Sequence, residues 1–123
     1  SAKVQFFKNL ERKKLIKLLK QSDLFCLPSV VEGFGLVTIE AAAAGLPYVI
    51  ADIEVNQEIS LGGQGGFLFK KQNVNDLTVK IEKLLLDKKL YLQKQKQALK
   101  LAKNYSWDKI ALETKEVYCK ALR

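Results

Sequence analysis

Two glutamates, Glu32 and Glu40, stand on either side of a turn that contains Gly33 and Gly35. Glycine allows the chain to turn tightly and lets a ligand approach the backbone closely. The residues after Gly35 predict the first turn of a helix, whose free N–H groups and dipole favour an anion. A carboxylate does not bind phosphate, but it accepts hydrogen bonds from the vicinal hydroxyls of a ribose or a hexose. Together these residues predict a pocket for a nucleotide that carries a sugar.

The turn is expected to lie between a buried strand and a helix of small residues. The largely apolar run at residues 23–28 predicts a parallel strand buried on both faces, which Pro28 and Ser29 end. The following helix is expected to end at Gly45, because Pro47 cannot continue it, and residues 48–51 form the next buried strand. Asp52 is expected to cap a short helical turn that extends to residue 59.

The glycine-rich stretch at residues 62–66 is interpreted as a connecting loop. It lacks the Lys and the Ser or Thr of a P-loop, and a strand at residues 67–69 follows it instead of a helix.

Further elements flank this central region. A strand at residues 4–7 precedes a basic amphipathic helix at residues 10–20, for which Asn9 is the expected N-cap. Three more helices are predicted: one capped by Asn73 or Asn75, a basic one at residues 90–103, and a last one capped by Ser106. The alternation predicts an α/β fold: a Rossmann-like three-layer domain with a parallel sheet of about four strands, helices on both faces, and a ligand at the strands' carboxyl ends.

The charge of the chain is unevenly distributed. The formal net charge of the 123 residues is +8, but every Lys and Arg lies in residues 1–20 or from Lys70 onward. Residues 21–69 hold six acids and no base; the acids are Asp23, Glu32, Glu40, Asp52, Glu54 and Glu58. A diphosphate bound at the turn would therefore need cations from elsewhere.

Several residue types limit the chemistry. The chain has no His, the commonest general base and metal ligand, and no metal site is expected. Cys26 and Cys119 lack metal-ligand spacing and are expected to be buried free thiols. No apolar run reaches the length of a membrane span, and the length allows one domain.

Motifs in a fixed order along nearly the whole chain point to a known family. They are residues 22–29, 32–36, 40–41 and 45–47, then Asp52 with Glu58, and residues 65–68, 76–77 and 105–107. In this order they resemble the C-terminal, donor-binding domain of retaining glycosyltransferases of the GT-B fold, in the large group 1 (family 4) set.

The resemblance implies a role for each residue of the turn. The family's pattern of Glu, any seven residues and Glu falls on Glu32 and Glu40. Glu32, the catalytic position, would bind hydroxyls of the transferred sugar, and Glu40 the ribose hydroxyls. The donor's sugar and phosphates would be lined, largely through the backbone, by Gly33, Phe34, Gly35 and Leu36. Thr38 is a further candidate for a phosphate contact, although a local hydrogen bond of its hydroxyl is the favoured interpretation.

The resemblance also implies a reaction and the parts that it needs. Such enzymes move a hexose from a nucleotide sugar, such as a UDP- or GDP-hexose, to a glycan or lipid acceptor with retention, without a bound metal or other cofactor. The family's diphosphate-binding Arg and Lys, its first two strands of this domain and its acceptor domain have no counterpart before Val4. The 123 residues alone are therefore expected to have no transferase activity. Residues 4–7 are expected to pair directly beside residues 24–27, or the chain is expected to associate with another chain. Residues 6–8 are a candidate for the base pocket.

Two other classes of protein function stay open at this point. A sugar-nucleotide epimerase would use a similar fold, although the acid–base constellation for proton transfer is not visible. A non-catalytic interaction module would bind anionic lipid or another polyanion through the basic helices at residues 10–20 and 90–103. Sequence-specific binding of nucleic acid is not expected, because aromatic residues are not interleaved with the basic ones. The expected location is the cytoplasm, with peripheral contact at the inner face of the membrane left open.

Overall fold

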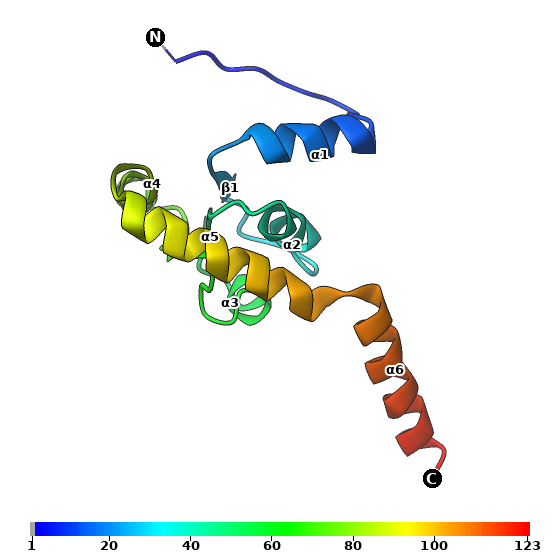
Figure 1. Cartoon of the computed structure of the whole chain (residues 1–123). Helices are drawn as coiled ribbons and strands as arrows, with labels where there is room; N and C mark the ends of the chain where they lie inside the picture. The colour runs from blue at the N-terminus through cyan, green and yellow to red at the C-terminus, as the bar shows by residue number, and fades with distance from the viewer. Residues whose placement is uncertain (1) are drawn as a thin grey trace.

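The computed structural model describes residues 2–123 (Figure 1). Among these residues, three strands form a parallel sheet. The strands are β1 (Phe25–Leu27), β2 (Tyr48–Ala51) and β3 (Gly66–Phe69), in the spatial order β1-β2-β3. Phe25 pairs with Tyr48, and Tyr48 in turn pairs with Gly66. The central strand β2 is completely buried, as its run of apolar residues predicts.

Helices cover both faces of the sheet. On one face, Tyr48 and Ile50 pack with α2 (Leu36–Ala43) and with Ala98 and Leu101 of α5 (Lys88–Ala102). On the other face, Val49 and Ala51 of β2 pack with α4 (Val74–Leu86), mainly through Leu84. Side chains of a strand point alternately to its two faces, so a single strand serves both cores. The three-layer α/β arrangement is as expected.

Local sequence signals fix most of the element ends. Gly45 has φ +78°, and its N–H bonds the Ala42 carbonyl while the Leu46 N–H bonds the Ala41 carbonyl, which is a Schellman end for α2. Asn73 caps α4 by accepting from the Asp76 N–H at 2.9 Å. Ser106 caps α6 (Trp107–Ala121) in the same way.

Three expectations about the first part of the chain are wrong. No strand forms at residues 4–7, which run as an extended arm away from the sheet with no neighbouring strand to bond (Figure 1). Helix α1 (Arg12–Gln21) follows Glu11, because Asn9 has φ +54° and does not adopt the extended conformation of an N-cap. Strand β1 forms an edge of the sheet and is only partly buried, so the Cys26 side chain is exposed.

Two smaller differences concern a cap and a thiol. Helix α3 (Glu54–Ile59) forms as expected, but Ile53 precedes it and Asp52 instead accepts a hydrogen bond from the Gln57 side chain. Cys119 lies exposed on α6 rather than buried. Helix α6 follows a single turn of 3-10 helix, η1 (Lys103–Tyr105), and projects from the body with no buried residue (Figure 1).

Candidate functional site

The turn at residues 33–35 leads directly into the N-terminus of α2, where the backbone offers free donors. Gly35 has φ +78° and precedes the helix, and no side chain caps this end. The N–H groups of Leu36 and Val37 therefore have no intrahelical partner. Both residues are exposed, as is Phe34, so the helix begins at the surface of the protein. This arrangement favours an anion at the helix end.

Two other elements support the turn from behind. A Cβ on Gly35 would lie 2.5 Å from the Cδ1 atom of Ile59, so α3 packs directly against this glycine. The ring centroids of Tyr105 and Phe34 lie 6.2 Å apart in an edge-to-face arrangement. The Tyr105 hydroxyl donates a hydrogen bond to the Ile59 carbonyl at 2.8 Å. Ile59 and Tyr105 thus hold the turn in place. Tyr105 is visible in the sequence only as part of a motif, and no local pattern there indicates these contacts.

Gly33 differs from Gly35 in having free space around it. A Cβ built at Gly33 meets no atom within 4 Å, and its φ is not in the left-handed region. A side chain at Gly33 would extend into the open region in front of the turn. The two glycines can therefore be separated by experiment, because only one of them is required by the packing of the protein itself.

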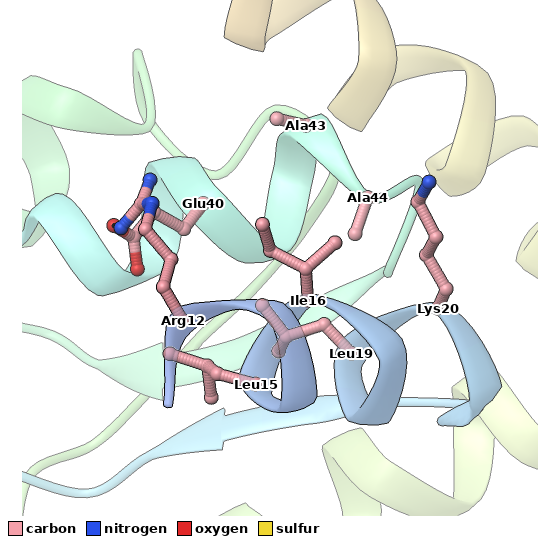
Figure 2. Close-up of a pocket in the computed structure, with 8 residues that line it drawn as sticks. All are labelled: Arg12, Leu15, Ile16, Leu19, Lys20, Glu40, Ala43 and Ala44. Atoms are coloured by element: carbon pink, nitrogen blue, oxygen red, sulfur yellow. The ribbon is translucent and has the colours of Figure 1, made fainter. Parts of the chain in front are cut away.

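The two glutamates lie in different elements of the site, and both are half-buried. Glu32 is in the loop before the turn and is half-buried. Glu40 lies in the second turn of α2, and its side chain is 25% exposed. The Nη1 atom of Arg12 lies 3.3 Å from its Oε1 atom (Figure 2). The fold thus brings a cation from α1 to a region whose own sequence has none.

Thr38 lies beneath the helix end rather than at its surface. It is fully buried, and its hydroxyl has no hydrogen-bond partner among residues 2–123, so the expected local bond is not formed. Asn56 of α3 is also fully buried; its Nδ2 donates to the Ala51 carbonyl, but its Oδ1 lacks a partner. A ligand would reach the Thr38 hydroxyl only if the residues above it moved. A phosphate contact at Thr38 stays a prediction.

The glycine-rich loop at residues 62–66 serves packing. A Cβ on Gly65 would lie 2.6 Å from the Cα atom of Ala98, and one on Gly66 would lie even closer to the Tyr48 backbone. The Gly65 N–H also bonds the Gln97 side chain of α5 at 3.2 Å. These contacts agree with the interpretation of this stretch as a connecting loop between α3 and β3.

A cavity of about 230 Å³ separates α1 from α2 beside Glu40 (Figure 2). Its walls are mostly apolar, and the Arg12–Glu40 pair forms its polar end, with Lys20 at the other. The apolar wall consists of Leu15, Ile16, Leu19, Ala43 and Ala44. Among residues 2–123, no three His, Cys, Asp or Glu side chains lie together as metal ligands would. The helices described are all too short or too polar to cross a bilayer.

The sequence and the structure are similar to known sugar-transferring enzymes. The family model described as "Glycosyl transferases group 1" matches residues 1–104. The chain is 33% identical over 120 residues to a glycogen synthase of Mycobacterium tuberculosis, covering 97% of this chain and 29% of that protein. It is 35% identical over 112 residues to N,N'-diacetylbacillosaminyl-diphospho-undecaprenol alpha-1,3-N-acetylgalactosaminyltransferase of Campylobacter jejuni, covering 91% of this chain and 30% of that protein.

A solved structure matches over nearly the whole chain. Sucrose-phosphate synthase from Thermosynechococcus elongatus superposes with a TM-score of 0.84 at 25% identity, over 96% of this chain and 30% of that one. The Rossmann-like fold class, as part of a GT-B fold, is confirmed by this match. The chain spans about 30% of the length of these relatives.

Proposed function

We propose, from the premise that this chain belongs to the group 1 glycosyl transferases, that it supplies part of a nucleotide-sugar donor site. The donor would be a nucleotide hexose, and the reaction would transfer the hexose with retention to a glycan or lipid acceptor. The acceptor would bind to parts of the protein outside these 123 residues. No metal or other cofactor is assigned to the reaction in this proposal.

The uncapped N-terminus of α2 carries the proposal. The free N–H groups of Leu36 and Val37 follow directly on the turn at residues 33–35, so they can bind the donor's diphosphate through the backbone. Glu40 lies one turn further along the same helix, with a half-buried carboxylate suited to the ribose hydroxyls. Glu32, at the other end of the turn, would bind the hydroxyls of the hexose.

A substitution at Glu32 tests the catalytic assignment. Glu32→Ala in the full-length natural protein should lower turnover by about a hundredfold or more, as expected for a group that binds the reacting sugar. The free energy of unfolding should change little, because no hydrogen bond or ion pair of Glu32 is present among residues 2–123. Glu82→Ala removes an exposed acid from α4 and serves as the control. Near-normal sugar transfer by Glu32→Ala would overturn the assignment.

The basic surface of α1 favours a second, peripheral role at a membrane. Helix α1 has no buried residue, and it exposes Lys13, Lys14 and Lys17, while the preceding Phe6 is 94% exposed. Basic and apolar groups on one exposed segment suit the inner, anionic face of a membrane, where a lipid acceptor would lie.

Vesicle binding tests this second role. Vesicles with anionic lipid should bind the protein in low salt, and exchange of the three lysines for Glu should abolish binding. The same exchange at the α6 lysines Lys109, Lys115 and Lys120 is the control. Equal loss in both variants would show only a general effect of charge and would count against α1.

A further inference from the structure

The contact between Arg12 and Glu40 joins two helices at the edge of the proposed donor site. Arg12 lies in the first turn of α1 and Glu40 in the second turn of α2, and the Nη1–Oε1 distance is 3.3 Å (Figure 2). Glu40 Oε1 accepts this hydrogen bond, and no residue from 2 to 123 donates to Oε2. One oxygen of the carboxylate is therefore held while the other is left available.

The cation in this contact is an arginine in a chain that otherwise uses lysine. Of 21 basic residues, only Arg12 and Arg123 are arginines. A guanidinium is planar and presents its N–H groups in a fixed fork, so it fixes the orientation of a carboxylate better than an ammonium does. An arginine at position 12 therefore suits a role in orientation.

The contact contributes little to the stability of the fold. The side chain of Arg12 is 74% exposed, and exposed ion pairs are weak because water screens them. The orientation of Glu40 depends on Arg12 nevertheless, because the cavity wall on the side of Ala43 and Ile16 is apolar and offers no other partner. Without Arg12, the carboxylate would be free to adopt other rotamers.

We propose that Arg12 is a positioning residue of the donor site, which holds Glu40 Oε1 so that Oε2 faces the ribose hydroxyls of the nucleotide. This inference rests on the proposed function, since it assigns a second residue to ribose recognition. Arg12 does not touch the reacting atoms and acts through Glu40.

Paired nucleotides with and without the 2′-hydroxyl separate this role from others. Dissociation constants of the full-length natural protein are measured for UDP and 2′-deoxy-UDP, and for the matching GDP and ADP pairs. The nucleotide pair with the base that gives the tightest binding is then used to compare the variants. The wild type should prefer the ribonucleotide by about tenfold or more, the discrimination expected for one hydrogen bond to a charged group.

The variants should change this preference in a defined order. Glu40→Ala should abolish the preference, and Arg12→Ala should reduce it several-fold without changing the affinity for the deoxynucleotide. Arg12→Lys should retain an intermediate preference, and Arg12→Ala combined with Glu40→Ala should behave as Glu40→Ala alone. Lys13→Ala, which removes the same charge from the next residue of α1, should leave the preference unchanged.

Other results would overturn either the role of Arg12 or the role of Glu40. If Arg12→Ala weakens the binding of the ribonucleotide and of the deoxynucleotide equally, Arg12 acts on the phosphates or the base, and the positioning role is overturned. An unchanged preference in Arg12→Ala also overturns it. If the wild type has no preference, or Glu40→Ala keeps it, the role of Glu40 in the proposed function fails instead. If the wild type binds no nucleotide, both are wrong.

Discussion

The packing of Gly35 against α3 allows the first turn of the site to be tested with a matched control. Gly35 and Gly62 both have φ +78°, so alanine is strained at both positions. A Cβ at Gly35 would lie 2.5 Å from Ile59 Cδ1, whereas a Cβ at Gly62 meets nothing within 4 Å. Both substitutions therefore share the strain of a positive φ, and Gly35→Ala adds a steric clash.

The expected losses follow from these geometries. The left-handed conformation costs an alanine about 1–2 kcal/mol at either position. Gly35→Ala must also displace the side chain of Ile59, which is 3% exposed, and overpacking a core of this kind costs about 1–3 kcal/mol more. We expect Gly35→Ala to lower the free energy of unfolding by about 2–5 kcal/mol.

Urea titration followed by circular dichroism measures both variants, and a third variant tests the cause. Ile59→Val removes the Cδ1 atom; alone it should cost about 0.5–1.5 kcal/mol, but it should restore part of the stability lost in Gly35→Ala. Equal losses for Gly35→Ala and Gly62→Ala, or no rescue by Ile59→Val, would refute the argument that Ile59 fixes the turn.

Other predictions concern the core and its ionisable groups. Leu84→Ala should lower the free energy of unfolding by about 2–5 kcal/mol in urea titration, because Leu84 is fully buried. Leu86 is 83% exposed and should tolerate alanine, and a similar loss of stability in Leu86→Ala would contradict the assigned core. Burial raises the pKa of Tyr48 above its usual value of 10.0, so the folded protein keeps a proton that the unfolded chain releases at high pH. The contribution of Tyr48 to the free energy of unfolding should thus be constant below pH 10.0 and should fall above it. Urea titrations at several pH values should show a smaller fall for Tyr48→Phe than for the wild type. Parallel pH dependences of the two proteins would contradict this role of Tyr48. Both cysteines are exposed, but partial burial of the Cys26 thiol raises its pKa, so iodoacetamide should modify Cys26 more slowly than Cys119 of α6 at mildly alkaline pH. Mass spectrometry of the modified peptides measures both rates, and faster modification of Cys26 would contradict this.

Features with a local physical cause were predictable from the sequence. The Schellman end at Gly45, the cap at Asn73 and the cap at Ser106 each depend on a few neighbouring residues. The buried strand β2 follows from a continuous apolar run. The same kind of signal placed the turn before α2, because glycine and a following helix are both visible in sequence.

Features that depend on distant partners were not predictable. Residues 4–7 have the composition of a strand, but a strand forms only beside another one, and none lies next to them among residues 2–123. The exposure of β1 likewise depends on its place at the sheet edge. The contacts of Arg12 with Glu40 and of Phe34 with Tyr105 join segments far apart in sequence, and only the folded chain brings them together.

The central claim is that the start of α2 binds the phosphates of a nucleotide sugar, and hydrogen exchange measures it most directly. The backbone N–H groups of Leu36 and Val37 have no intrahelical partner, so they should exchange rapidly in the free protein. The full-length natural protein is tested with UDP-glucose, GDP-mannose, ADP-glucose and UDP-N-acetylglucosamine in turn. The sugar nucleotide that binds should slow exchange at residues 35–37, and Glu40→Ala should weaken this protection. Binding that protects only other parts of the protein would contradict the claim.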